Sequence, residues 1–176
     1  MAKSDSFFIR ASVFVDDDAT FQQTSIDLGS YVSALGKSIL RVHNIEYEWV
    51  QGSDGAVPNT APFVDAGTLA SANWQLTTQS QTGMVGLDSK AVIGKGMIWT
   101  FNPDGASGAP SQVYNDSHAP QHFSNGYLVA VETIYLGGFA TDNWAETSQL
   151  TCNMVLECTV ETMSQAGAMA LSLSQQ

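Results

Sequence analysis

Apolar and polar residues alternate along much of the chain, which is the pattern of half-buried β-strands. Every odd position from Phe7 to Val15 is apolar, and Arg10 and Ser12 fall on the opposite face. The alternation in LTCNMVLECTVETM, residues 150–163, is the most regular in the chain. Both stretches are predicted to be strands with one buried face.

The stretch SILRVHNIEYEWV also alternates, but its phase changes near the middle. Val42 has one parity, whereas the apolar residues from Ile45 to Trp49 have the other. A β-bulge at His43 and Asn44 would keep both sets facing one core, because a bulge adds a residue to one strand of a pair.

Further strands are predicted in ATFQQTSIDL, LASANWQLTTQSQ, MIWTF and YLVAVETIYLGG, the last as one strand from Tyr127 to Leu136. The first of these is rich in polar and β-branched residues, which suits a sheet edge. The helical spacing in GSYVSALGKS predicts one or two helical turns there. Residues 51–67 and 102–126 are rich in turn-forming residues and are expected to be long polar loops.

Seven or eight strands joined by loops of unequal length predict an all-β fold, an antiparallel β-sandwich. A single jelly roll of about eight strands fits best, because that fold accommodates long crossing loops. The length suits one domain, and we expect residues 1–176 to form it.

Charge is sparse and acidic, with 13% charged residues and a formal net charge of -11. Direct binding to nucleic acid is not expected, because no Lys or Arg follows Lys95 and neither terminus is a basic arm. The sequence shows no signal peptide, and no apolar stretch approaches the roughly 18 residues of a membrane span. We therefore expect synthesis in a cytoplasm and no transmembrane segment.

Catalytic motifs are weak, and we predict neither an enzyme activity nor a cofactor. The end of a phosphate-binding loop motif is matched by Gly36, Lys37 and Ser38. The motif also needs a glycine five positions earlier, where this chain has Tyr31. Two carboxylates on one face of a strand, those of Glu46 and Glu48, are expected to form part of a solvated surface.

The histidines and cysteines give no clear site either. His118 and His122 are four residues apart in a proline-containing segment with no third metal ligand nearby. His43 could join them in a catalytic constellation, though no motif supports one. Cys152 and Cys158 would lie about 20 Å apart in a straight strand at about 3.3 Å per residue, so they are expected to be reduced core residues.

Asp16, Asp17 and Asp18 directly follow the first predicted strand. They are interpreted as a turn, and no metal site within a single copy is expected, because calcium needs 6 to 8 gathered oxygens. A sharper alternative is that two or three copies of this turn share a divalent cation at a subunit junction.

Aromatic residues offer one candidate contact. Trp49, Trp74 and Trp99 are expected to pack in the core, although tryptophans can also form a sugar platform. Trp144, in the polar segment ATDNWAETSQ, is expected to be exposed and to contact a partner or ligand.

Three segments, DLGSYVSALGKSILRVHNIEYEW, NGYLVAVETIYLGG and MVLECTVETMSQAGAMALSLSQQ, together resemble the single jelly-roll capsid proteins of tailless icosahedral viruses, particularly those whose shell encloses a membrane. The resemblance is one of layout. It implies a virion subunit that assembles with copies of itself into capsomers of an icosahedral shell. It also allows a second coat protein as a partner and an internal viral membrane close to the shell. Capsid proteins that package nucleic acid directly usually carry an Arg-rich terminus, which this chain lacks.

Two other functions stay open at this point. A carbohydrate-binding jelly-roll module would account for the tryptophans and the acidic charge, but such modules are normally exported. A cupin-like enzyme would need clustered His and Glu ligands on adjacent strands, and His43 is the only histidine in a predicted strand.

Overall fold

The computed structural model describes residues 5–16, 19–33, 37–51, 68–102, 111–141 and 149–176, together with residues 35, 55, 58 and 144. This part of the chain holds nine strands, one short 3-10 helix and a C-terminal α-helix. The elements are β1 Phe7–Asp16, β2 Gln22–Asp27, β3 Ser38–Gln51, β4 Thr68–Thr77, β5 Val92–Asn102, β6 Ser111–His118, η2 Pro120–His122, β7 Tyr127–Val129, β8 Thr133–Ala140, β9 Gln149–Thr162 and α1 Gln165–Ser174.

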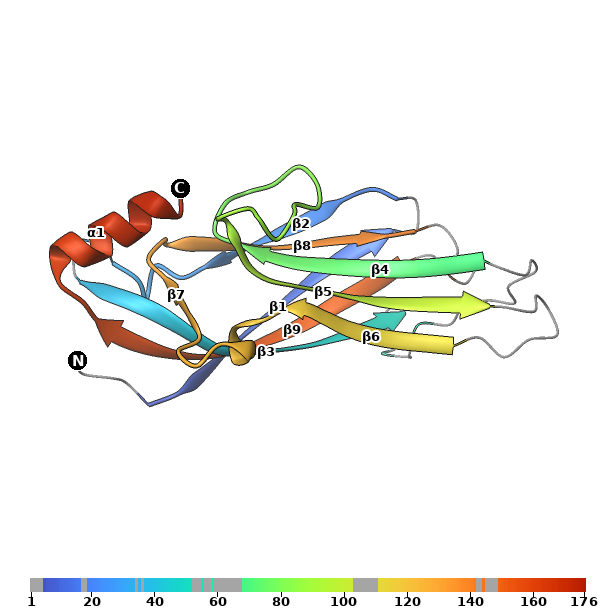
Figure 1. Ribbon diagram of the computed structural model, residues 1–176, viewed down its shortest axis with the longest axis horizontal. Helices are drawn as coiled ribbons and strands as arrows, with labels where there is room; N and C mark the ends of the chain where they lie inside the picture. The colour runs from blue at the N-terminus through green and yellow to red at the C-terminus, as the bar shows by residue number, and fades with distance from the viewer. Residues whose placement is uncertain are drawn as a thin grey trace.

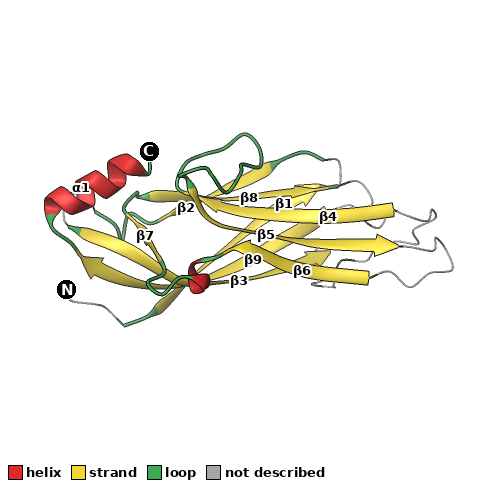
Figure 2. Cartoon of the chain, in the orientation of Figure 1, coloured by secondary structure: helices red, strands yellow, loops and turns green. Residues whose placement is uncertain are grey.

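Two antiparallel sheets pack against each other as a sandwich (Figures 1 and 2). One has the order β1-β9-β3-β7 and the other the order β2-β8-β4-β5-β6. The pairs β1/β9, β2/β8, β3/β7 and β4/β5 are nested along the chain and alternate between the two sheets. One long hairpin wound around itself gives this arrangement, so the fold is a jelly roll with one extra edge strand, β6.

The core lies between the sheets and is filled by the apolar side chains on the inward face of each strand. Val13 and Val15 of β1 and the even positions from Leu150 to Cys158 of β9 are buried, as the alternation predicts. The predicted bulge in β3 is confirmed, since the pairing with β9 shifts between Val42 and Asn44. Residues on both sides of the bulge therefore reach the same core.

Helix α1 packs on the outer side of the four-stranded sheet. Ile39, on the opposite face of β3 from the main core, forms a second small cluster with Ala130 and Ala168. The helix begins after Ser164, whose hydroxyl accepts a hydrogen bond from the backbone N–H of Gly167. No helix in the described residues is long and apolar enough to cross a membrane.

Three sequence predictions about elements are wrong. The predicted strand from Tyr127 to Leu136 is two strands, β7 and β8, in different sheets. The segment expected to form helical turns contains a turn and a backbone bridge between Ser33 and Ser38. The N–H and carbonyl groups of these two serines bond each other at the start of β3, so they are not available to a helix. The region 102–126 is not all loop, since it contains β6 and η2.

Candidate functional site

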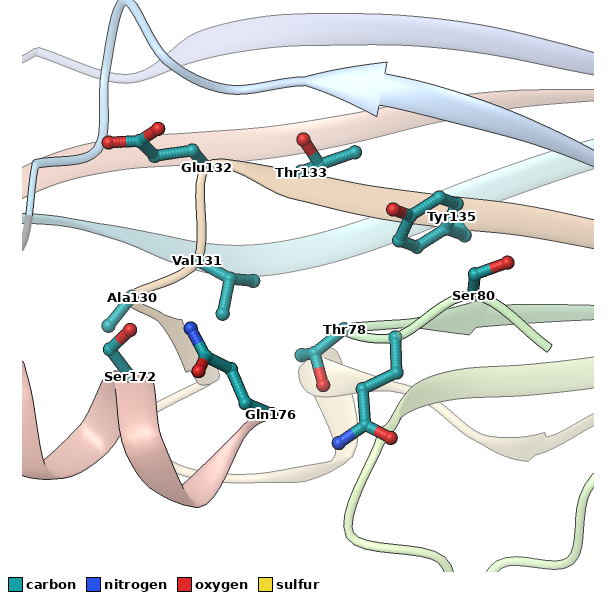
Figure 3. A pocket seen from close by; sticks show the side chains of 10 residues that line it. Thr78, Ser80, Ala130, Val131, Glu132, Thr133, Tyr135, Ser172 and Gln176 are labelled. Atoms are coloured by element: carbon teal, nitrogen blue, oxygen red, sulfur yellow. The ribbon is translucent and has the colours of Figure 1, made fainter.

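A polar cavity of about 610 Å³ lies where α1 ends beside the turn between β7 and β8 (Figure 3). The segment that follows β4 forms the opposite wall. In Figure 3 Tyr135 lies on one side of the hollow, and the side-chain amide of Gln176 lies on the other side, near Ser172. The lining residues are Thr78, Gln79, Ser80, Ala130, Val131, Glu132, Thr133, Tyr135, Ser172 and Gln176.

Gln175 makes four hydrogen bonds that hold the end of α1 at the cavity wall. Its side-chain amide donates to the carbonyl of Leu128 at 2.6 Å and accepts from the N–H of Ala130 at 2.9 Å. Its own carbonyl accepts from Thr78 Oγ1 at 2.9 Å and Gln79 Nε2 at 3.1 Å. The helix end is therefore tied to both sheets.

The cavity offers hydrogen bonds from hydroxyl and amide groups, and Glu132 is the only charged residue of its lining. None of these lining residues is a nucleophile hydrogen-bonded to a base. Sequence reasoning missed the site, because its residues come from three distant segments with no shared motif.

The predicted aspartate site is only partly visible. Asp16 is the last residue of β1 and lies opposite Gln149 of β9, while Asp17 and Asp18 lie outside the described residues. Across the described part of the chain, no three His, Cys, Asp or Glu side chains are grouped as metal ligands.

Two of the tryptophan predictions are wrong. Trp144 is only 6% exposed, and its Nε1 donates to the carbonyl of Ser71 at 3.2 Å. Trp99 is only partly buried and lies on the outer face of β5, because Ile98 takes the inner face. Trp49 and Trp74 are fully buried, as predicted.

The remaining polar candidates lie on the surface of the four-stranded sheet or near η2. Glu46 and Glu48 are exposed, as predicted, and each accepts a hydrogen bond at 3.0 Å from a nearby asparagine. Nε2 of His43 lies 2.9 Å from Thr159 Oγ1. Burial, and then the charge of His122, lowers the pKa of His118 below its ordinary value.

Both cysteines are free and buried, as predicted. Burial raises the pKa of Cys158 to about 12 and also raises that of Cys152. The thiolate is the reactive form, so neither cysteine is poised for nucleophilic chemistry near neutral pH.

Both outer faces of the sandwich carry exposed apolar side chains. On β1, Phe8 and Phe14 are 56% and 63% exposed. On the five-stranded sheet, Leu69, Phe101 and Val113 are 49%, 38% and 37% exposed. The exposure of Phe8 and Phe14 could have been predicted from the sequence. Both have even numbers, like Arg10 and Ser12, and the polar pair identifies the even positions of β1 as its outer face.

No family model and no curated protein matches the sequence. Among solved structures, the chain is similar to that of Desmodium yellow mottle tymovirus, with a TM-score of 0.32, 9% identity and coverage of 89% of this chain and 87% of the other. It is also similar to Merkel cell polyomavirus VP1 in complex with the GD1a oligosaccharide (TM-score 0.38, 9% identity, 89% and 96% coverage). A third similar structure is Trichodysplasia spinulosa-associated polyomavirus VP1 in complex with the GM1 oligosaccharide (TM-score 0.39, 10% identity, 90% and 94% coverage). These likenesses are remote, and the strand order itself defines the jelly roll.

Proposed function

We propose that the chain is a structural subunit of a virion shell and that its copies associate through the outer faces of the sandwich. The observation that carries this proposal is the exposure of large apolar side chains on both sheets, with Phe8 and Phe14 on one and Leu69, Phe101 and Val113 on the other. Contiguous exposed apolar surface usually marks a protein contact, and the cross-strand register makes Leu69, Phe101 and Val113 such a surface together with Trp99. The jelly-roll strand order agrees with the family that the sequence resembles.

The finer parts of the proposal rest on that resemblance. The subunit would form capsomers of an icosahedral shell, with a second coat protein as a further partner and an internal membrane nearby. Its net charge of -11 favours contact with neutral or basic protein surfaces over direct contact with nucleic acid. The protein would reside in the virion after synthesis in the host cytoplasm.

Assembly of the purified protein tests the proposal. We expect sedimentation velocity to show oligomers whose population grows with concentration, and electron microscopy to show capsomer-sized particles. A monodisperse monomer at every protein and salt concentration would contradict a shell function.

The cation hypothesis for Asp16, Asp17 and Asp18 is tested in the same assay. If copies share a divalent ion there, a chelator weakens assembly without changing the monomer fold, and Asp17→Asn reproduces that loss. Unchanged assembly of the Asp17→Asn variant would remove the hypothesis and leave the shell function standing.

Carbohydrate binding is the second candidate, and the polar cavity beside α1 is the observation that favours it. Its hydroxyl and amide groups match the hydrogen-bonding needs of a sugar, whereas three of the four tryptophans are buried. Glycan-array binding that is lost in Tyr135→Phe would support this function. Trp144→Ala is a poor probe for it, because Trp144 is a buried, hydrogen-bonded residue.

A further inference from the structure

The β7 edge of the four-stranded sheet and the β6 edge of the five-stranded sheet differ in how they are covered. On the four-stranded sheet, the amide of Gln175 bonds the carbonyl of Leu128 and the N–H of Ala130 at the β7 end. Further along the same edge, the amide of Gln121 accepts from the N–H of Ile45 at 3.1 Å and donates to its carbonyl at 3.0 Å. These two glutamines replace the hydrogen bonds that a further strand would make.

Among the described residues, none covers the edge formed by β6 in this way. Within the described residues, β6 pairs with β5 alone. Its residues Val113, Tyr114 and Asn115 are exposed, and SQVYNDSH contains no proline, lysine or arginine. Natural proteins usually protect an edge strand with such residues, so an unprotected edge is a site at which another strand can pair.

An apolar strip adjoins this edge on the outer face of the five-stranded sheet. The cross-strand register places Val113 beside Trp99, and Phe101 beside Leu69. Leu69, Phe101 and Val113 are among the exposed apolar residues named above. The strip therefore runs from the edge strand across β5 to β4.

The charge of this surface indicates what covers it. β4 and β5 contain no acidic residue, and β6 contains one, Asp116. Glu46 of β3 lines a pocket with Tyr114, but Tyr114 lies beside Ile98 on the inner face, away from the strip. Two copies of a chain with a net charge of -11 repel each other, and this repulsion is weakest where acidic groups are fewest. A second copy also presents the same strand, and antiparallel pairing of two identical strands satisfies both edges by symmetry.

We propose that β6 pairs antiparallel with β6 of a second copy across a two-fold axis, which joins two five-stranded sheets into one continuous sheet. The inference rests on the proposed shell function and names the surface through which two subunits meet. The apolar strips of the two copies then lie on the same face of the joined sheet. The β6 pair supplies backbone hydrogen bonds, and the side chains at the edge supply apolar contact.

Charge substitution tests the surface. Val113→Asp places a carboxylate of each copy within the β6 pair, so we expect the dissociation constant of the dimer to rise at least tenfold. Leu87→Asp is the matched control, because Leu87 is an exposed leucine outside the strands and the change in net charge is the same. Both variants should keep the circular dichroism spectrum of the wild type.

Disulfide trapping tests the geometry separately. Opposed residues in an antiparallel pair have Cα atoms about 4.5 to 5.5 Å apart, within the range of a disulfide. Among Val113→Cys, Tyr114→Cys and Asn115→Cys, at least one should form covalent dimers on mild oxidation, while Leu87→Cys should not. Cys152 and Cys158 are buried and should not interfere.

The outcomes separate this inference from the shell function. If the wild type assembles, Val113→Asp assembles equally well and no β6 cysteine cross-links, the β6 interface is wrong and the shell function stands. If the wild type is a monomer under all conditions, the shell function and the interface fall together. Weakened association with cross-linking at β6 supports both.

Discussion

Trp74 lies in the five-stranded sheet, and the residues beside it on both neighbouring strands are glycines. The register places Gly96 of β5 and Gly138 of β8 opposite Trp74. A Cβ atom at Gly96 would lie 2.7 Å from Trp74 Nε1 and 3.0 Å from the carbonyl oxygen of Asn115. The indole therefore occupies the space that any other residue at position 96 would need.

We predict that Gly96→Ala lowers the free energy of unfolding by about 1–3 kcal/mol, because overpacking forces the indole or the backbone to move. Urea denaturation followed by tryptophan fluorescence measures the change. Gly83→Ala is the matched control, since a Cβ there meets no atom within 4 Å. Equal losses in both variants would show that packing around Trp74 is not the cause.

Arg41 and Glu161 form a buried ion pair between β3 and β9. Arg41 Nε and a second guanidinium nitrogen donate to the two carboxylate oxygens at 2.7 and 2.8 Å, and the Glu161 side chain is 0% exposed. The hydrogen bond to Glu161 also raises the pKa of Arg41. Removing one member of a buried, hydrogen-bonded ion pair is costly.

We predict that Arg41→Met destabilises the protein by about 3–5 kcal/mol, because it removes the two charge-assisted hydrogen bonds that Arg41 donates to the buried carboxylate of Glu161. The double variant Arg41→Met, Glu161→Leu should recover most of that loss, since it removes both charges. Thermal and urea unfolding of the two variants and the wild type complete the comparison. A double variant no more stable than Arg41→Met would argue against this reason.

At the scale of residues, the sequence predicted the burial of a side chain correctly where the local pattern allows only one arrangement of the strand. The bulge near His43 follows from a phase change that a regular strand cannot accommodate. Trp99 was misplaced because MIWTF is apolar on both parities, so alternation does not choose the inner face. The burial of Trp144 depends on the carbonyl of Ser71, 73 residues away, which local pattern cannot reveal.

At the scale of elements, the strands with one buried face were predicted well and the connections were not. The apolar run from Tyr127 to Leu136 contains no Gly or Pro before its end, so nothing in it marks the passage between sheets. β6 has only weak alternation in a polar region. Helix α1 was not predicted because it has no charged residues, and its position depends on contacts with Ile39 and Ala130.

Gln175 holds α1 against β7, so we predict that Gln175→Leu loosens the helix. The variant leaves the N–H of Ala130 and the carbonyl of Leu128 without these partners, at about 1–3 kcal/mol per buried group. Hydrogen exchange should accelerate in α1 and at Ala130. Gln176→Leu, at an exposed neighbouring residue, should change neither. Unaltered exchange in Gln175→Leu would show that apolar packing alone holds the helix.

At the scale of the whole molecule, alternation and loop lengths were enough to predict the jelly roll. The exposed apolar surfaces were harder to predict, because the exposure of a side chain depends on which strands become neighbours. The strip of Leu69, Phe101 and Val113 joins residues from three strands that only the register brings together. The single-domain extent of residues 1–176 and the shared cation site both stay predictions.

The net charge of -11 allows a prediction about how assembly depends on salt. An interface with few charges gains little from ion pairs, whereas the two subunits as wholes repel each other. Added salt shortens the Debye length from about 10 Å at 0.1 M to about 3 Å at 1 M, which screens that repulsion. We therefore expect the dissociation constant to fall several-fold between these concentrations of potassium chloride.

Sedimentation velocity at a series of potassium chloride concentrations measures this effect, and pH provides a control for its origin. Moving the pH toward the isoelectric point near 4.3 reduces the net charge, so the salt dependence should become smaller. Chloride is preferable to sulfate, because sulfate also strengthens apolar burial. If salt instead weakens association, ion pairs hold the subunits together, and the contact must include the charged face around Arg10, Glu46 and Glu48.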